Sequence, residues 1–508
     1  MALNLRQFVR NVASQWLGIV LQAVVAFAVT PYQIRRLGEE GNGVLMVINS
    51  YVGYSGLLNL GLGSAIVKYI AEHNAREEWD ELNETASTIF TIYLAIGAFC
   101  LLAGLALAVP LPHLARLPPE LASQGQLLLC LMSVALFFQF PGSVYSGALM
   151  GLQRFDLINT YVLVLLVART VGVVLVLKYH PSLVLVGAIN MASFILDQVA
   201  AYLWSRRLLP QLRCSPSLFR RARVRKVFGF SSQAFLFQVA ERLINATDSL
   251  VITQAKGPGP VTHYQNGLTL VDKARELLEK AAIVLMPGVS DAAARKDTRT
   301  LRSLWRSGNK ASLMLAMPVA LVLIVWGRHV VTLWLDQDLA SKAYESLAWL
   351  AAAFVMQTLG RGVAKPLFEG WGKISLPARV TIVEGAANLI LSVVLVRTWG
   401  IAGVAFATFL PAAVSGLLVL PYLACRELQV SFLAHLFHTF VRALPPLVPA
   451  YGVLWYAERL GLHQHLWGLA VTCPLVLLVY VLGGLVVTFQ RDERAALMAP
   501  ILRRLGRA

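Results

Sequence analysis

The chain has 508 residues, of which 57% are hydrophobic and 14% are charged, and its mean hydropathy is +0.64. A soluble protein would carry about 25% charged residues, so this composition excludes a soluble globular enzyme and indicates a membrane protein. The formal net charge of +17 requires no nucleic-acid partner, because the Lys and Arg residues gather in the segments between apolar stretches.

Stretches of 18 or more mostly apolar residues recur along the whole chain, and about 20 such residues cross the hydrocarbon core of a bilayer. The first stretch lacks a short apolar core with a cleavage site after it, so we expect an uncleaved first helix. The sequence predicts an all-α polytopic membrane protein with about fourteen transmembrane helices, at 12–33, 44–65, 86–109, 125–148, 157–177, 183–204, 229–254, 262–286, 310–335, 343–364, 375–397, 400–424, 438–457 and 466–489.

Basic residues predict the orientation, because cytoplasmic segments are enriched in them. The side that carries both termini holds 29 Lys and Arg residues, and the opposite loops hold 9. Both termini are therefore expected in the cytoplasm. The densest cluster, from Arg206 to Lys226, is interpreted as a topology anchor that touches anionic lipid headgroups, or alternatively as a regulatory or partner-docking loop. The five scattered cysteines predict neither disulfides nor a metal site.

An internal repeat divides the chain. Ser14-Gln15 recurs as Ser232-Gln233, and segment 151–167 recurs at 370–386, at nearly the same offset. Such repeats characterise alternating-access transporters, whose substrate site lies between the halves. We expect two pseudo-symmetric six-helix lobes around a central polar cavity, with the N-terminal lobe at 1–210, a basic cytoplasmic linker at 211–227, the C-terminal lobe at 228–426, and two more spans with a basic cytoplasmic tail at 427–508.

The predicted eighth span contains "LTLVDKARELLEKAAIVLM" (268–286), which is unusual for its six ionisable groups. At about 100° per residue these six charges share an arc of about 160°, and the opposite arc is apolar. Ionisable groups at membrane depth cost several kcal/mol unless they face water or one another. We expect the charged arc to line a polar interior. A helix lying on the membrane surface, or purely structural ion pairs one turn apart, are the alternatives.

The predicted seventh span has the same design, with polar residues at i, i+3, i+4 and i+7 spacing. These residues are Gln238, Glu241, Arg242, Asn245 and Asp248.

Other ionisable residues inside spans are interpreted as weaker sites. Arg169 and Asp197 are expected to pair with each other, while Arg361 and Glu384 are treated as isolated cavity or interfacial groups. His435 and His438 are interpreted as interfacial histidines and not as metal ligands.

Several segments resemble the oligosaccharide flippases (Wzx type, the polysaccharide-biosynthesis branch) of the multidrug/oligosaccharidyl-lipid/polysaccharide exporter superfamily. They include "RNVASQWLGIVLQ", "RRLGEEGNGVLMVINSYVGYSGLLNLGLGSAIVKYIAE", "GLQRFDLIN" and "IVEGAANLILSVVLVRTWGIAGVAFAT". The resemblance covers essentially the whole chain. It implies fourteen helices in two six-helix lobes around a central cavity. It also implies transport of undecaprenyl-diphosphate-linked glycans from the inner to the outer leaflet of the bacterial cytoplasmic membrane.

The resemblance also implies roles for single residues. Cations of the cavity would hold the diphosphate, neighbouring polar groups would contact the substrate, and carboxylates would couple transport to H⁺ or Na⁺, with no further cofactor. The expected substrate-binding residues are Arg242, Lys273, Arg275, Lys280, Asn245 and Gln238, and the expected ion-coupling residues are Asp248, Glu241, Asp272 and Glu276. The carboxylates of the eighth span nearly cancel its cations, which departs from a strongly cationic cavity.

The function expected is an ion-coupled flippase of the inner membrane for cell-surface polysaccharide, working beside a polysaccharide polymerase and chain-length machinery. A lipid II flippase or a cation-coupled drug exporter of the same superfamily is the main alternative. A membrane glycan polymerase or ligase would need a sizeable outward loop with catalytic residues, and the outward segments here are short. A scaffold protein would have no use for charges at this depth. We therefore expect a transporter and not an enzyme.

Overall fold

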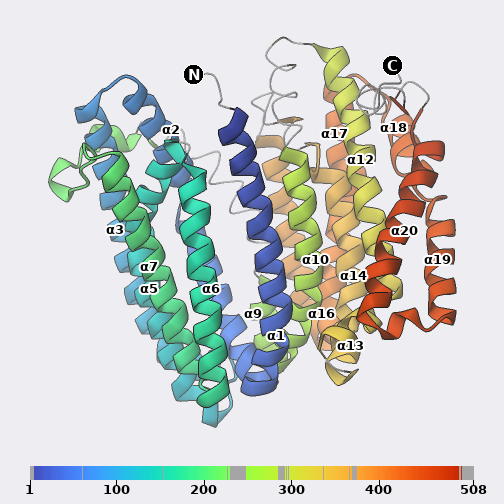
Figure 1. Ribbon diagram of the computed structural model, residues 1–508, viewed down its shortest axis with the longest axis horizontal. Helices are drawn as coiled ribbons and strands as arrows, with labels where there is room; N and C mark the ends of the chain where they lie inside the picture. The colour runs from blue at the N-terminus through green and yellow to red at the C-terminus, as the bar shows by residue number, and fades with distance from the viewer. Residues whose placement is uncertain are drawn as a thin grey trace. The chain divides into compact units, whose positions relative to one another are not determined.

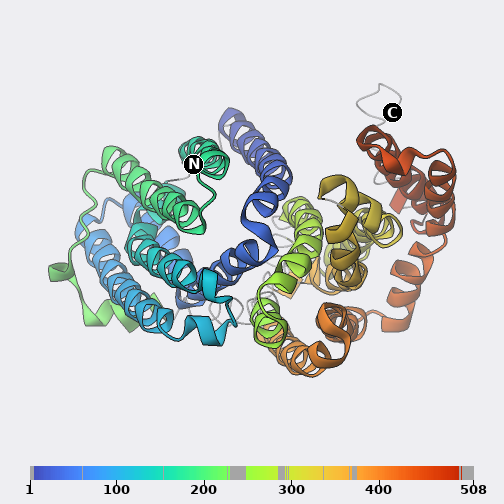
Figure 2. The ribbon, with the colours of Figure 1, turned by 90° about the horizontal axis from the view of Figure 1, so that it is seen from below.

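The computed structural model describes most of the chain, and every regular element among the described residues is a helix. The described residues are 5–59, 61–152, 154–225, 227–228, 247–283, 292, 295, 297–335, 337–364, 367–368, 375–490 and 493–494. They fall into two compact units, Met1–Thr262 and His263–Ala508. The helices are drawn in Figure 1 and are seen along their axes in Figure 2.

The first unit is a bundle in which α5 packs against both α3 and α7, and α1 packs against α6. Small residues allow these close approaches. A Cβ atom on Gly147 of α5, for example, would lie 2.3 Å from the Ile66 side chain of α2. The elements are α1 (Leu5–Ser55), η1 (Gly56–Asn59), α2 (Leu62–Ala75), α3 (Trp79–Ala108), α4 (Leu111–Leu114), α5 (Pro119–Gly151), α6 (Phe155–Tyr179), α7 (Leu183–Leu208), η2 (Pro216–Leu218) and α9 (Thr247–Lys256).

Helix α1 combines the first predicted span with part of the second. It breaks at Gly38, whose φ of +76° is in the left-handed region that favours glycine, and this break falls in the predicted turn. The second span was predicted at 44–65, and the structure divides this range between two helices. The helix ends at Ser55, and α2 starts at Leu62 after Gly61, another left-handed glycine. The glycine-rich stretch between them raises the cost of a continuous helix.

The second unit continues from α10, which begins four residues before the unit does. Helix α14 packs against α12, α16 and the π-helical segment η3. The elements are α10 (Gly259–Ile283), α12 (Thr298–Val325), α13 (Gly327–Trp334), α14 (Gln337–Arg361), α16 (Ser375–Ala413), η3 (Val414–Val419), α17 (Leu420–Glu427), α18 (Phe432–Thr439), η4 (Val441–Ala443), α19 (Leu447–Arg459), η5 (Leu462–Gln464) and α20 (Leu466–Val487).

Seven helices in the described ranges are long and apolar enough to cross a membrane. One of them, Ser375–Glu427, contains both the eleventh and the twelfth predicted spans, with a break at Gly400 (φ 60°) between them. The predicted class, an all-α polytopic membrane protein, is confirmed. The predicted boundary between the lobes stays a prediction, because residues 229–246 lie outside the described residues.

Candidate functional site

Helix α10 is the charged eighth span of the sequence prediction, and it forms one continuous helix from Gly259 to Ile283. It starts after Gly257, whose φ of +84° permits the turn that redirects the chain, and Pro260 in its first turn is compatible with a helix start. The expectation that its charged arc lines a polar interior stays a prediction, because Ala274 and Leu278 of the apolar arc are half-buried like the charged residues. Leu270 and Val271 are buried, while the described charged side chains of the next turn are partly exposed.

The described charges of α10 form two ion pairs within the helix. Lys273 Nζ lies 3.0 Å from Glu276 Oε2, and Arg275 Nη1 lies 3.0 Å from Asp272 Oδ1. Both pairs have i, i+3 spacing, at which helical side chains are neighbours. The four charges therefore neutralise one another pairwise in this conformation. The side chains of Glu279 and Lys280 lie outside the described residues.

Arg275 also reaches a second helix. Its Nη2 atom donates a 2.9 Å hydrogen bond to Oε1 of Gln357 on α14. Gln357 is buried, at 8% exposed, and sequence reasoning missed it. The available signal was a lone amide side chain in the otherwise apolar run "LAWLAAAFVMQTLG". Arg275 is thus held on two sides, by a carboxylate of its own helix and by an amide of α14.

One turn beyond Gln357, Arg361 ends α14 and forms an ion pair with α16. Arg361 Nη2 lies 2.6 Å from Glu384 Oε2, and the Glu384 side chain is only 2% exposed. The hydroxyl of Ser415, in η3, donates to the same carboxylate oxygen. The interpretation of Arg361 and Glu384 as isolated groups is therefore wrong. They are distant in sequence, and the packing of α14 on α16 brings them together.

The remaining predicted site residues are distributed as follows. Asp248 lies in α9 of the first unit and is buried at 4% exposed. The other four residues predicted on the seventh span lie outside the described residues; they are Gln238, Glu241, Arg242 and Asn245. The expected pair of Arg169 with Asp197 is not formed, and Asp197 instead accepts a 2.9 Å hydrogen bond from Gln198.

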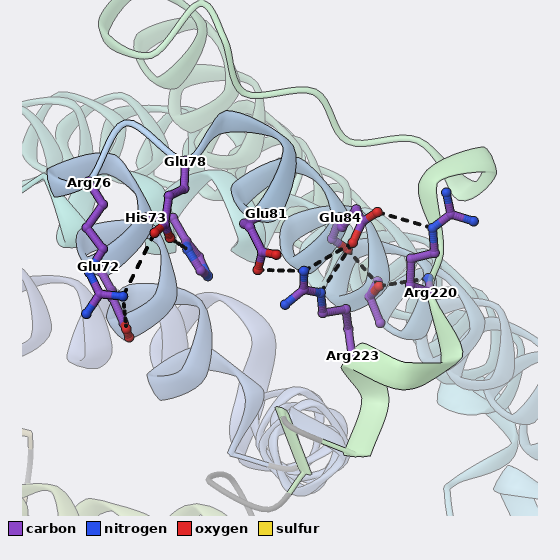
Figure 3. A network of polar contacts seen from close by, with 9 residues as sticks. Glu72, His73, Arg76, Glu78, Glu81, Glu84, Arg220 and Arg223 are labelled. Carbon is purple, nitrogen blue, oxygen red and sulfur yellow. Dashed lines mark hydrogen bonds and ion pairs between the residues drawn. The ribbon is translucent and has the colours of Figure 1, made fainter.

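The basic cluster after α7 is bound to the first turns of α3, as Figure 3 shows. Arg223 Nη2 lies 2.5 Å from Glu81 and 3.2 Å from Glu84, and Arg220 also reaches Glu84 at 3.2 Å. The hydrogen bond to Glu81 raises the pKa of Arg223 above its ordinary value. Carboxylates near a helix N-terminus are favoured by the helix dipole, so α3 presents a stable anionic surface to the linker.

Backbone hydrogen bonds complete this attachment. Arg213 N donates to Asn83 Oδ1 at 2.7 Å, Ser215 N donates to Ser87 Oγ at 3.1 Å, and Arg220 N donates to Thr88 Oγ1 at 3.2 Å. The linker is thus a fixed part of the first unit over these residues. The other described arginines of the basic cluster have exposed side chains, namely Arg206, Arg207, Arg213, Arg221 and Arg225.

A buried lysine, which sequence reasoning also missed, connects α12 with the C-terminal segment. Lys310 is 2% exposed, and its Nζ atom lies 2.6 Å from Glu493 Oε2. Nearby, the ring of His435 stacks on Trp305 of α12 with 5.0 Å between ring centroids. Burial, with the charges of Arg306 and Lys310, lowers the pKa of His435 to about 4. No group of three possible metal ligands occurs in the part of the chain that the structure describes.

Comparisons with known proteins agree with this architecture. The family described as "Polysaccharide biosynthesis protein" matches residues 8–293, which is more than half of the chain. The "Uncharacterized membrane protein EpsK" of Bacillus subtilis is 21% identical over 399 residues, covering 77% of each chain. The "Putative O-antigen transporter" of Shigella flexneri is 20% identical over 416 residues, covering 81% of this chain and 96% of that protein.

Two solved structures share the fold. An inward-facing multidrug resistance MATE family transporter of the MOP superfamily aligns with a TM-score of 0.68 at 15% identity, over 80% of this chain and 94% of that one. The lipid II flippase MurJ in an inward closed conformation aligns with a TM-score of 0.67 at 13% identity, over 95% of this chain and 100% of that one. The resemblance found in the sequence is confirmed.

Proposed function

We propose, from the premise that the chain belongs to the polysaccharide biosynthesis protein family, that it is a flippase for lipid-linked glycans. Its substrate would be an undecaprenyl-diphosphate-linked oligosaccharide repeat unit, moved from the inner to the outer leaflet of the bacterial cytoplasmic membrane for cell-surface polysaccharide. A relative whose printed description is a putative O-antigen transporter supports this substrate class. A polysaccharide polymerase and chain-length machinery would act on the product.

The observation that carries this proposal is the charged face of α10 within a helical membrane unit. A lipid-linked glycan has an anionic diphosphate and polar sugars, which cannot cross hydrocarbon, and an isoprenoid tail, which can remain in it. Cations in a polar interior can hold a diphosphate through charge-assisted hydrogen bonds. Arg275 is well suited to this role because Asp272 and Gln357 fix its guanidinium in position.

The two ion pairs of α10 suggest how an anion is bound and released. In the described conformation Asp272 holds Arg275 and Glu276 holds Lys273. A partly buried ion pair is only marginally favourable after desolvation, so a diphosphate can compete for the cations once the carboxylates are neutralised. Binding of H⁺ or Na⁺ to these carboxylates would therefore favour the substrate-bound state, and their re-pairing would expel the diphosphate.

The residues predicted on the seventh span would also take part in substrate binding and ion coupling. Arg242 with Gln238 and Asn245, and Lys280 on α10, would contact the substrate. Glu241 and Asp248 would take part in ion coupling. Alternating access by the two halves, with both termini in the cytoplasm, completes the proposal.

The test is a reconstituted transport assay. The purified protein is placed in liposomes with a fluorescent undecaprenyl-diphosphate-linked oligosaccharide, and accessibility of the label to an impermeant quencher is followed with and without a pH or Na⁺ gradient. We expect gradient-driven translocation in the wild type and its loss in Arg275→Ala. The matched control is Lys342→Ala, which breaks a pair with Asp338 at the exposed start of α14. Translocation that is equal in protein-free liposomes would refute the proposal.

The same assay separates the related functions. Lipid II shares the diphosphate and the isoprenoid but carries a different headgroup, and a drug exporter would move neither lipid. Transport of lipid II in preference to the oligosaccharide carrier, or extrusion of a cationic dye alone, would assign the chain to the corresponding alternative.

A further inference from the structure

We infer that a cavity between α17 and α18 binds one phospholipid with an anionic, hydroxyl-bearing headgroup of the phosphoglycerol class. This lipid would be a resident of the membrane and not the transported substrate, so the inference goes beyond the proposed function. The cavity and the helices around it, α12, α17 and α18, all belong to the second unit. Figure 1 shows these three helices next to one another at one end of that unit.

The cavity has a volume of about 310 Å³ and opens between the end of α17 and the start of α18. The residues that line it are Tyr422, Cys425, Arg426, Gln429, Val430 and Phe432. The rings of Tyr422 and Phe432 meet edge to face, with 5.9 Å between their centroids. Small-molecule sites have volumes of about 300–1,000 Å³, so this cavity has room for a lipid headgroup and not for a whole oligosaccharide.

Arg426 supplies a cation at this cavity. Its side chain is exposed, and its guanidinium has neither an ion pair nor a hydrogen bond with any residue that the structure describes. Glu427 follows it in the chain but does not line the cavity. A guanidinium presents a planar set of N–H donors that matches the oxygens of a phosphate group. A phosphate in the cavity is therefore the group that complements Arg426.

Helix α12 adds positive charge beside the cavity, and a buried hydrophobic cluster joins this helix to α17. Arg302 Nε donates a 2.7 Å hydrogen bond to the carbonyl oxygen of Leu428, two residues after Arg426. Arg306, one turn further along α12, is exposed, and its charge contributes after burial to the low pKa of His435. Within the described ranges neither Arg302 nor Arg306 has a carboxylate partner. The field at the cavity is therefore positive, which favours an anionic headgroup over a zwitterionic one.

The helix ends at the cavity are compatible with an anion. Carbonyl groups at the end of α17 already accept hydrogen bonds, because Val430 N donates to Cys425 O at 2.9 Å and Gln429 N donates to Arg426 O at 3.2 Å. Helix α18 begins at Phe432, on the other side of the cavity. The positive end of its dipole therefore lies at the cavity and adds to the attraction of an anion.

Gln429 has a strained backbone at the cavity. Its φ of +53° is in the left-handed region, which glycine adopts without cost and other residues rarely adopt. Its side chain lines the cavity, and Nε2 donates a 3.1 Å hydrogen bond to Arg426 O. The amide oxygen Oε1 accepts no hydrogen bond from the residues that the structure describes, so it can accept one from a headgroup hydroxyl. Strain of this kind gathers at ligand-binding sites.

An exposed stripe on η3 and α17 indicates that the ligand is a lipid. Val414, Leu418 and Tyr422 are four residues apart and are 48%, 46% and 51% exposed, and Arg426 follows at the same spacing. Residues four apart shift by about 40° around an α-helix, and the wider turns of the π-helix η3 shift them back, so the stripe stays on one face. Arg426 lies at the end of the membrane-crossing helix Ser375–Glu427, at headgroup level. An acyl chain along the stripe would place its phosphate at Arg426.

The first experiment measures lipid binding by native mass spectrometry of the full-length protein in detergent. Phosphatidylglycerol is added in steps, and we expect one tightly bound lipid per chain. Arg426→Ala removes a charge-assisted contact with the phosphate, so its affinity should fall at least about tenfold. Arg397→Ala is the matched control, because Arg397 is exposed and lies before the break at Gly400, away from the cavity. Equal binding by Arg426→Ala and the wild type overturns the inference.

Further ligands in the same experiment test the class of headgroup. Phosphatidylethanolamine is zwitterionic, and phosphatidic acid lacks the hydroxyl-bearing glycerol, so both should bind more weakly than phosphatidylglycerol. Gln429→Gly relieves the backbone strain and removes the amide, so it should lose the preference over phosphatidic acid. An unchanged preference contradicts the role of Gln429. Equal binding of phosphatidylethanolamine, equal binding of water-soluble glycerol 3-phosphate, or tighter binding of undecaprenyl diphosphate would each overturn the assignment to a resident anionic phospholipid.

Thermal unfolding in detergent gives a second measurement. A ligand that binds only the folded protein raises the midpoint of unfolding. Phosphatidylglycerol should therefore raise the midpoint of the wild type and of Arg397→Ala, and should raise that of Arg426→Ala much less. Because the Arg426 side chain is exposed, Arg426→Ala should unfold at the wild-type midpoint when no lipid is added, which separates lost binding from lost folding. Equal stabilisation of Arg426→Ala and the wild type by phosphatidylglycerol would contradict the site.

Discussion

Arg275 of α10 donates a 2.9 Å hydrogen bond to Gln357 of α14, and the same guanidinium lies 3.0 Å from Asp272 on its own helix. These two contacts hold the Arg275 guanidinium in one position between the Asp272 carboxylate and the neutral amide of Gln357. A hydrogen bond to a charged group contributes about 1.5–3 kcal/mol, so removing either partner changes how available the guanidinium is to a substrate.

The first prediction separates these two partners. Gln357→Leu removes the amide and leaves the ion pair, so the guanidinium loses orientation but keeps its charge. We expect about a tenfold loss of glycan translocation, since about 1.4 kcal/mol corresponds to a factor of ten. Arg275→Ala should abolish translocation. Liposome transport measures both, and an unimpaired Gln357→Leu variant would contradict the positioning role.

The second prediction concerns the exposure of α10. Single cysteines at Asp272 and Glu276 should react rapidly with small water-soluble thiol reagents, because these positions are partly exposed on the charged arc. Cysteines at Leu270 and Val271, which are buried on the other arc, should react slowly. Mass spectrometry after timed labelling gives the rates. Equal rates on both arcs would favour the helix on the membrane surface.

The third prediction is a pH dependence for Cys214, which lies in the linker after α7. Burial is the main cause that raises the pKa of its thiol to about 12. The thiolate is the nucleophile, so on the order of 10⁻⁵ of the thiol is reactive at pH 7. Maleimide labelling in a variant with no other cysteine should therefore be slow and should accelerate about tenfold per pH unit. Fast labelling at pH 7 would contradict this.

Because Cys214 is expected to react slowly, the membrane topology is tested at a neighbouring exposed position. Ser217→Cys in a cysteine-free background has an exposed side chain in the same linker. An impermeant maleimide should label it in inverted membrane vesicles and not in intact cells, because the predicted orientation places the linker in the cytoplasm. Labelling in intact cells would reverse the orientation.

The fourth prediction measures how the linker is attached to α3. Arg223→Gln removes contacts with Glu81 and Glu84, of which the shorter is 2.5 Å. The pair is partly exposed, so we expect a loss of about 1 kcal/mol in the free energy of unfolding. Arg221→Gln changes a neighbouring exposed arginine and should leave the free energy of unfolding unchanged. Thermal unfolding in detergent compares them, and equal effects would mean that only net charge matters.

The fifth prediction tests the contact of α14 with η3. Gly360→Ala places a methyl group 2.4 Å from a backbone atom of Gly416, so one of the two segments must move. Overpacking of this kind costs about 1–3 kcal/mol. Gly452→Ala in α19 is the matched control, because a Cβ atom there meets nothing within 4 Å and alanine favours the helix. A Gly360→Ala variant as stable as the control would disprove the close contact.

The sequence determined the class of the protein, the positions of most helices and the polar face of α10. These properties depend on local composition and on the helical period, both of which can be read without knowing any neighbour. The break at Gly38 falls in a predicted turn, and the break at Gly400 falls at the first residue of the predicted twelfth span, because glycine tolerates the backbone angles that end a span. The resemblance to a family followed from the order and spacing of short motifs.

Only the tertiary structure decided which polar groups are partners. Arg361 and Glu384 looked isolated because they belong to different helices, and their contact depends on how closely α14 approaches the segment around η3. In the sequence, Gln357 is one polar residue in an apolar span. Its contact with Arg275 is found only in the packed structure. Glu84 and Arg223 are 139 positions apart and meet because the linker folds back over α3. Hydropathy gives the depth and the face of a side chain, whereas its partner is decided by the distance and rotation of the neighbouring helix.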